Sequence, residues 1–181
     1  MSGADTQKGQ ADDPYAPLIV TAELPLDLFS WATQLRTDYF PPERNHLKAH
    51  VTLFHALPHF CRDEAGDALA RLAGENGPVP ARLESVMNLG RGTALRIESR
   101  AMLDLREELA ARFHGLLTQQ DMQTPRLHIT VQNKVKLAEA IALQAQLSAS
   151  LIPRDFAFRG LELHRYLGGP WAFIKRWRFR G

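Results

Sequence analysis

The stretch His50-Val51-Thr52-Leu53 decides the fold, because the chain repeats it in nearly the same form as His128-Ile129-Thr130-Val131. Each copy lies in a short run of β-branched and apolar residues, which is typical of a strand. Residues two apart on a strand point to one face, so the histidine and threonine of each copy share a face and the apolar residues share the other. The sequence therefore predicts two strands, each with a polar His/Thr face and an apolar face for helices to cover.

Further helices and strands are expected around both copies. Apolar spacing and flanking caps predict helices over residues 27–39, 62–75, 103–118 and 137–148. Runs of strand formers bounded by turn residues predict strands over residues 17–24, 50–57, 81–89, 93–98, 127–131, 156–166 and 171–179. The β-α-β order around His50 recurs around His128, which indicates a degenerate internal duplication. Strands mixed with helices and hairpins predict an α+β fold with two largely antiparallel sheets.

Bulk composition is that of an ordinary globular protein. The 181 residues are 45% hydrophobic and 23% charged, enough for a real core. Residues 1–14 contain no apolar run, so we expect a loose tail before a single domain of residues 15–181, and neither a signal peptide nor a membrane span. One cysteine, Cys61, excludes an intrachain disulfide framework and fits the reducing cytoplasm.

Positive charge is concentrated in the last part of the chain. Residues 154–181 hold seven Lys or Arg against two Asp or Glu, a net +5. Such a segment suits an anionic ligand, although a solvated basic face is as common. Within it, residues 171–180 interleave aromatics with cations, as surfaces that bind single-stranded nucleic acid do. A non-catalytic module that binds RNA or a nucleotide is therefore an alternative, but the alternation favours a core face formed by Trp171, Phe173, Trp177 and Phe179.

The paired His-x-Thr-apolar motifs resemble the signature of the 2H phosphoesterases, the superfamily that includes bacterial 2'-5' RNA ligases and cyclic-nucleotide phosphodiesterases. The resemblance covers about residues 17–179. It implies a bilobal α+β fold whose two pseudo-symmetric lobes flank a central cleft, with helices on the outside. It also implies that His50, Thr52, His128 and Thr130 form the catalytic set. The implied substrates are 2',3'-cyclic phosphates or 2'-5' phosphodiesters of RNA or nucleotides, and ligation as the reverse reaction stays open.

The chemistry of such a site needs one group on each side of phosphorus, because the entering and leaving oxygens lie in line. A duplicated lobe would place His50 on one wall and His128 on the other. Imidazole titrates near pH 6.5, so one histidine can act as general base while the other, protonated beside the phosphate, acts as general acid. The hydroxyls of Thr52 and Thr130 can donate to the non-bridging oxygens. Which histidine is the acid stays open.

Two positions depart from the pattern of the 2'-5' RNA ligases. Those proteins usually have proline directly before the second histidine and often arginine soon after the motif, whereas here Leu127 precedes it and Gln132-Asn133-Lys134 follows. Lys134 is a candidate for the missing cation, and Trp171 is a candidate for stacking a base. These two residues are the expected substrate-binding positions.

The sequence favours neither a metal nor a cofactor. Four histidines, at 46, 50, 55 and 59, crowd into one segment, but His50 and His55 would face opposite sides of a strand and no Cys or Glu pair completes a zinc set. His114 and His164 are more typical of structural residues. The expected partner is RNA or a nucleotide, with no membrane and no obligatory protein partner.

Overall fold

The computed structural model describes residues 13–181, so most of the expected N-terminal tail lies outside the described residues. The strands are β1 (Leu18–Glu23), β2 (Val51–Leu57), β3 (Val79–Asn88), β4 (Thr93–Glu98), β5 (His128–Gln132), β6 (Arg154–Phe158), β7 (Gly160–Tyr166) and β8 (Trp171–Arg178). The α-helices are α1 (Leu26–Tyr39), α2 (Arg62–Glu75), α3 (Arg100–Arg112) and α4 (Leu137–Ser150). Two short 3₁₀ turns, Pro42–Arg44 and His59–Cys61, flank β2.

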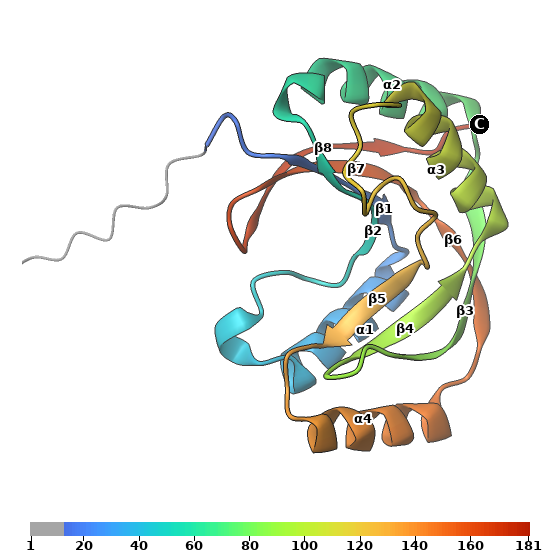
Figure 1. Ribbon diagram of the computed structural model, residues 1–181. Coiled ribbons are helices and arrows are strands. Elements are labelled where there is room, and N and C mark those ends of the chain that lie inside the picture. The colour runs from blue at the N-terminus through green and yellow to red at the C-terminus, as the bar shows by residue number, and fades with distance from the viewer. Residues whose placement is uncertain (1–12) are drawn as a thin grey trace, which may run out of the picture.

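The strands form two four-stranded antiparallel sheets (Figure 1). The first sheet has the order β2-β1-β7-β8 and the second has the order β5-β4-β3-β6. Helix α2 packs on β7 and β8 of the first sheet, whereas α1 packs on β5 and α4 packs on β3 and β4 of the second. The predicted α+β fold, with two similar lobes and largely antiparallel sheets, is confirmed.

The internal duplication is visible in the placement of the two motif strands. The unit β1-α1-β2 corresponds to β4-α3-β5, and each motif strand is an edge strand beside the first strand of its own unit. Both strands bulge directly after the motif threonine. Thr52 pairs with Thr21, but the next pair joins Phe54 to Val20, which leaves Leu53 extra. Thr130 pairs with Ala94 and Gln132 pairs with Thr93, so Val131 is extra in the same way.

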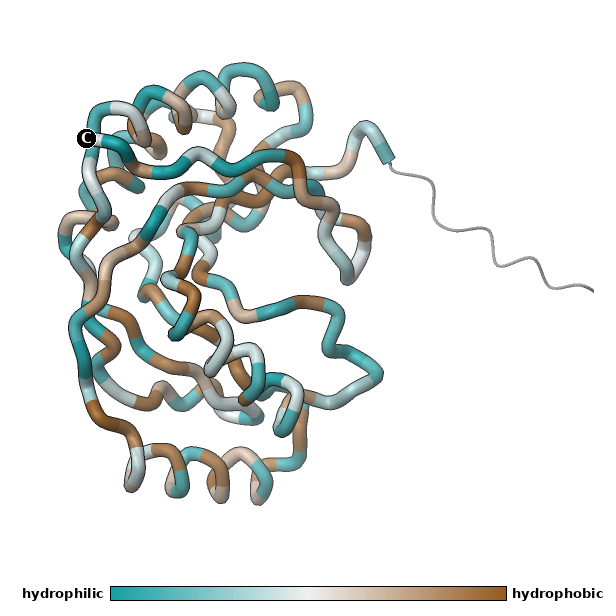
Figure 2. Tube along the Cα trace, turned by 180° about the vertical axis from the view of Figure 1, so that it is seen from behind, coloured by the Kyte–Doolittle hydropathy of each residue, from teal (hydrophilic) through white to brown (hydrophobic). Residues whose placement is uncertain are grey.

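The apolar faces of the motifs lie in the core, as the alternation predicts. Val51, Leu53, Ile129 and Val131 are fully buried, while both histidines and both threonines stay partly exposed. Figure 2 shows apolar and polar residues alternating along the strands, whereas the loop before β2 is mostly hydrophilic. Burial of the apolar side chains thus fixes the direction in which the polar ones point.

Two predicted elements differ from the structure by more than two residues. Residues 156–166 are not one strand, because β6 belongs to the second sheet and β7 to the first, and the chain crosses between the lobes at Arg159. Helix α3 starts at Arg100, where the Ser99 hydroxyl accepts a hydrogen bond from the N–H of Met102, and it ends at Arg112. His114 therefore lies in the turn after the helix, which passes through Gly115 at a positive φ.

The predicted aromatic core face of the last strand is wrong for its first half. Leu163 pairs with Lys175, but His164 pairs with Phe173, so Ile174 is an extra residue that reverses the alternation. Trp171 and Phe173 therefore share the face of His164, and Phe173 is 58% exposed. Beyond the bulge Trp177 turns to α2, where a Cβ at Gly66 would lie 3.6 Å from its ring. Strict alternation could not reveal a one-residue bulge.

Candidate active site

The two motifs meet because β2 and β5 are edge strands that contact each other, one from each sheet (Figure 1). His50 lies directly before β2, and His128 is the first residue of β5. The rings are close enough that a positive charge on His128 lowers the pKa of His50. The expected juxtaposition of the motifs is thus present in the fold.

Both imidazoles are held in the same way. His50 Nδ1 lies 2.7 Å from the carbonyl oxygen of Lys48, and His128 Nδ1 lies 2.6 Å from that of Arg126. A carbonyl oxygen only accepts hydrogen bonds, so each Nδ1 carries the proton and donates it to the residue two positions earlier. Each neutral ring then has its lone pair on Nε2, which is the nitrogen available to take or return a proton.

The motif threonines leave their hydroxyls available. Within residues 13–181, neither the Thr52 nor the Thr130 hydroxyl has a hydrogen-bond partner in the protein, and both side chains are partly exposed. A partly exposed hydroxyl without a protein partner can donate to a ligand at no loss of an internal hydrogen bond. Each histidine is therefore accompanied by a free donor on the same face of its strand.

The surroundings of His50 favour its neutral form. Desolvation by the protein packed around the ring lowers the pKa of His50 to about 4, although the residue stays partly exposed to solvent. The hydrogen bond to Lys48 acts in the opposite direction, and the positive charges of Arg36, His164 and His128 lower the pKa further. At neutral pH the ring is an uncharged base.

A buried arginine joins the two motifs. Arg36 of α1 is only 3% exposed, and its Nε lies 3.2 Å from Asn45 Oδ1 and 3.0 Å from the carbonyl oxygen of Leu47, in the loop that leads to His50. Its Nη1 donates to the carbonyl oxygen of Thr130 at 2.8 Å. Burial lowers the pKa of Arg36 to about 10, and no carboxylate pairs with it within residues 13–181. Its positive charge is therefore directed at the site without neutralisation.

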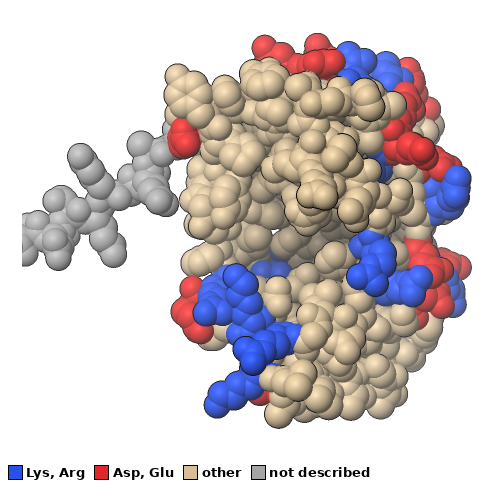
Figure 3. Space-filling view, in the orientation of Figure 1, with Lys and Arg blue, Asp and Glu red and all other residues tan. Residues whose placement is uncertain are grey.

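A large pocket opens on the His50 side of the motifs. Its volume is about 1180 Å³, and its walls are the inner face of the first sheet, the start of α1 and the loop before β2. His50 lines this pocket, whereas Thr52, His128 and Thr130 do not. Figure 3 shows a hollow between the two halves of the molecule, with acidic side chains mainly at the edges of the view. The large pocket thus lies beside His50 and not beside His128.

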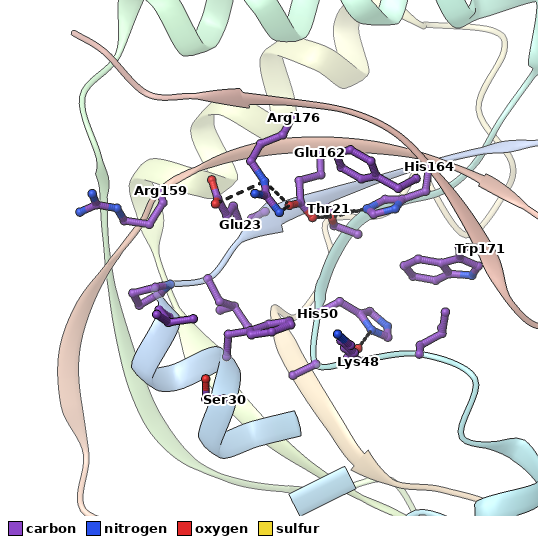
Figure 4. Close-up of a pocket in the computed structure, with 18 of the residues that line it drawn as sticks. Thr21, Glu23, Ser30, Lys48, His50, Arg159, Glu162, His164, Trp171 and Arg176 are labelled. Carbon is purple, nitrogen blue, oxygen red and sulfur yellow. Dashed lines mark hydrogen bonds and ion pairs between the residues drawn. The ribbon is translucent and has the colours of Figure 1, made fainter. Parts of the chain in front are cut away.

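Aromatic rings gather at the His50 end of the pocket (Figure 4). The Trp171 ring centroid lies 4.6 Å from that of His50 and 5.3 Å from that of His164. His164 Nε2 lies 3.0 Å from the Thr21 hydroxyl and 3.5 Å from a Glu162 carboxylate oxygen. Two imidazoles therefore flank Trp171, and its indole forms a wall beside the His50 ring.

Charged side chains follow along the strands (Figure 4). Arg176 contacts Glu162 at 2.7 Å and Glu23 at 3.3 Å. Burial alone would raise the pKa of Glu162, but the hydrogen bonds from His164 and Arg176 outweigh it, so the pKa lies below its ordinary value. Glu162 is therefore ionised at neutral pH, and Arg176 contacts both carboxylates.

Most of the residues selected from sequence are brought together, with one clear exception. Thr52 lies on β2, directly after His50 and Val51, while His128 and Thr130 lie on the facing strand β5, and Trp171 contacts His50. Lys134 lies beyond β5 at φ 58° and lines a separate depression of about 400 Å³ beside Tyr39 and Glu43.

Sequence reasoning missed Arg36, Thr21 and Glu162. Arg36 had one signal, since Leu28, Ala32 and Arg36 recur every four residues and form the buried face of α1. His164, which resembled a structural residue in the sequence, lines the pocket.

The four clustered histidines have four different surroundings. His46 lies beside Gly169 and His50 beside Trp171, whereas His55 pairs with Asp121 and His59 packs on Tyr15. The described residues contain no group of three or more His, Cys, Asp or Glu side chains placed to hold a metal ion. No helix among residues 13–181 is long and apolar enough to cross a membrane.

Comparison with known proteins points to one family. Residues 24–170 match the 2'-5' RNA ligase superfamily. The structure is similar to that of TT0787 of Thermus thermophilus, with a TM-score of 0.63 and 20% identity over 91% of this chain and 98% of that one. It is also similar to E. coli LigT crystallised with NADP+, with a TM-score of 0.54 and 19% identity over 92% and 99% of the two chains. No curated protein matches the sequence.

Proposed function

Because the chain belongs to the 2'-5' RNA ligase superfamily, we propose that it hydrolyses 2',3'-cyclic phosphates or 2'-5' phosphodiesters of RNA or nucleotides, with His50 and His128 as its acid–base pair. Family membership itself supports the broader class, a phosphoesterase. One observation carries the finer proposal. Each imidazole donates its Nδ1 proton to a backbone carbonyl and so frees Nε2, and the motif threonine that follows has no hydrogen-bond partner for its hydroxyl among residues 13–181.

The unequal surroundings of the histidines suggest their roles in hydrolysis. His50 is neutral at physiological pH and suits the general base. In this scheme His50 Nε2 takes a proton from water as the water oxygen bonds to phosphorus. The bond from phosphorus to the leaving ribose oxygen breaks, and that oxygen receives a proton from His128. The products are a phosphomonoester and a free hydroxyl. Ligation would use the same two groups with the 5'-hydroxyl of a second nucleotide in place of water, so that a phosphodiester forms as the ribose oxygen leaves.

The threonines would stabilise the charge that develops on the phosphate. Thr52 and Thr130 lie on facing edge strands, so their hydroxyls can donate to the two non-bridging oxygens from opposite sides. The bulge comes after each threonine in the chain. It therefore changes the direction of the next residue and leaves the direction of the threonine hydroxyl unchanged. The scheme assigns no step to a metal ion. With a single cysteine in the chain, we place the reaction in the cytoplasm.

Single substitutions test the proposed roles. We expect His50→Ala and His128→Ala each to lower kcat for 2',3'-cyclic AMP by at least about a hundredfold while circular dichroism shows a folded protein. The pH profiles of the residual activity separate the roles, since His50→Ala should lose the acidic limb and His128→Ala the alkaline limb. Near-normal turnover in either variant would contradict the proposal.

A further inference from the structure

We propose that the pocket on the first sheet binds a second phosphate of the substrate, at a subsite formed by Arg159 and Arg178 and distant from the phosphate that reacts. This inference rests on the proposed function and names the substrate class more closely. The preferred substrate would carry its reacting phosphodiester and a further phosphate on the 5' side of the same nucleotide.

The pocket is one-sided and too large for a phosphate alone. Its volume of about 1180 Å³ lies beside His50 and excludes the second motif, so the bulk of the ligand extends in one direction from the reacting phosphate. Sites for drug-sized ligands usually measure about 300–1,000 Å³. A nucleoside with an additional group fits this space better than a cyclic phosphate ring alone.

The register of the first sheet gives the distance between the first motif and Arg176. One row of paired residues crosses the sheet from Thr52 through Thr21 and Glu162 to Arg176. Three strand spacings separate the ends of this row, about 14 Å between Cα atoms. Arg178 lies two residues further along the same face of β8, opposite Gly160. Figure 4 shows the same arrangement, with His50 and Trp171 at one end of the pocket and Arg159 at the other.

Charges balance in the middle of the pocket but not at its far end. Arg176 and Arg178 match the charges of Glu23 and Glu162, and Asp27 at the rim is paired with Arg154. The Arg159 side chain has no hydrogen-bond or ion-pair partner within residues 13–181. A positive charge is therefore left over where the pocket ends.

Arg178 can contact both Glu23 and a bound phosphate. Its Nη2 is 3.6 Å from Glu23 Oε1, longer than a good charge-assisted hydrogen bond, and its side chain is 68% exposed. The backbone N–H of Arg159 donates to the carbonyl oxygen of Glu23, and the carbonyl oxygen of Arg159 accepts from the N–H of Phe179, so the two arginines sit on neighbouring, hydrogen-bonded segments. A phosphate between them would gain bonds from two guanidinium groups, which match its geometry well.

Binding of two nucleotides tests the subsite without requiring turnover. Titration calorimetry would compare adenosine 3'-monophosphate with adenosine 3',5'-bisphosphate. A third ligand, the dinucleotide ApAp, replaces the 5' phosphomonoester by a diester and so distinguishes a terminal phosphate from an internal RNA phosphate. We expect wild-type protein to prefer the bisphosphate by at least about tenfold, and the preference to fall below about threefold in Arg159→Gln/Arg178→Gln.

The matched control is Lys175→Gln, which removes one positive charge from the opposite face of the same strand. Lys175→Gln should still bind adenosine 3',5'-bisphosphate more tightly than adenosine 3'-monophosphate. Equal binding of the two nucleotides by wild-type protein would overturn the subsite, as would a preference that survives the double substitution or disappears in the control.

If the subsite is found but 2',3'-cyclic AMP is not hydrolysed, the proposed activity is wrong and the subsite stands. If wild-type protein hydrolyses 2',3'-cyclic AMP but binds the two nucleotides equally, the proposed activity is supported and the subsite is excluded.

Discussion

Arg36 of α1 donates a hydrogen bond from Nη1 to the carbonyl oxygen of Thr130 at 2.8 Å, so a helix of the first unit holds the motif strand of the second. Arg106 of α3 mirrors this contact, because its Nε donates to the carbonyl oxygen of Leu53 in the first motif strand at 3.2 Å. Each guanidinium also lies over a phenylalanine ring, Phe40 or Phe54. Each unit thus fixes the motif strand of the other unit at its bulge.

Removal of the Arg36 charge should alter both turnover and pH dependence. Arg36→Met leaves the carbonyl oxygens of Leu47 and Thr130 without their donor, and we expect kcat to fall by at least about tenfold as the two motifs lose their alignment. The positive charge of Arg36 helps to keep the pKa of His50 low, so its loss should move the acidic limb of the kcat/KM profile to higher pH. Arg36→Lys should lower kcat but leave that limb in place.

The control for this experiment is Arg44→Met, which removes an exposed arginine from the turn after α1. Urea unfolding of every variant would separate lost stability from lost alignment. An unchanged acidic limb in Arg36→Met would show that the arginine has only a structural role.

Trp171 should contribute to binding through its ring. Base stacking on an aromatic side chain is worth about 1–3 kcal/mol, so we expect Trp171→Ala to raise KM for 2',3'-cyclic AMP by about tenfold and Trp171→Phe to raise it much less. Ribose 2',3'-cyclic phosphate has no base, and its KM should change little. Trp31→Ala removes a half-exposed tryptophan outside the pocket and is the matched control. Equal losses on both substrates would mean that Trp171 acts through His50 and not on a base.

Asp121 should stabilise β2 from outside the site. Its carboxylate is 1% exposed and accepts from the backbone N–H groups of His55 and Ala56, where β2 is irregular. Burial alone would raise the pKa of Asp121, but the bonds from the His55 side chain and from both N–H groups outweigh it and lower the pKa. The ionised form therefore stabilises the folded state above about pH 4, and this contribution is lost as the pH falls below it.

Asp121→Asn should lower the free energy of unfolding at pH 7 by about 1–3 kcal/mol, measured by urea denaturation. The difference from wild type should narrow as the pH is lowered below about 4, because wild type loses the same charge as the pH falls toward the lowered pKa of Asp121. Asp104→Asn, at an exposed ion pair on α3, is the control and should change stability by less than about 1 kcal/mol. A constant difference across this pH range would count against the charge as the source of stability.

The local pattern of apolar and polar residues was enough to predict the fold class and the two motif strands. Residues two positions apart on a strand point to the same face, as His and Thr do in each motif. The pattern was not enough for the last strand, where one extra residue at Ile174 moves Trp171 and Phe173 to the pocket face. It also did not identify Arg36. The spacing of α1 places Arg36 on the buried face of the helix, but residue identity does not reveal that it bonds to the backbone carbonyl oxygens of Leu47 and Thr130. Contacts between lobes depend on three-dimensional placement, and a single sequence carries little record of them.

Hydrolysis of 2',3'-cyclic AMP in the presence of EDTA, by wild type and by the double variant His50→Ala/His128→Ala, tests the central claim most directly. We predict that wild-type activity survives chelation and that the folded double variant has none above background. Activity that EDTA abolishes, or that the double variant retains, would contradict catalysis by the two histidines.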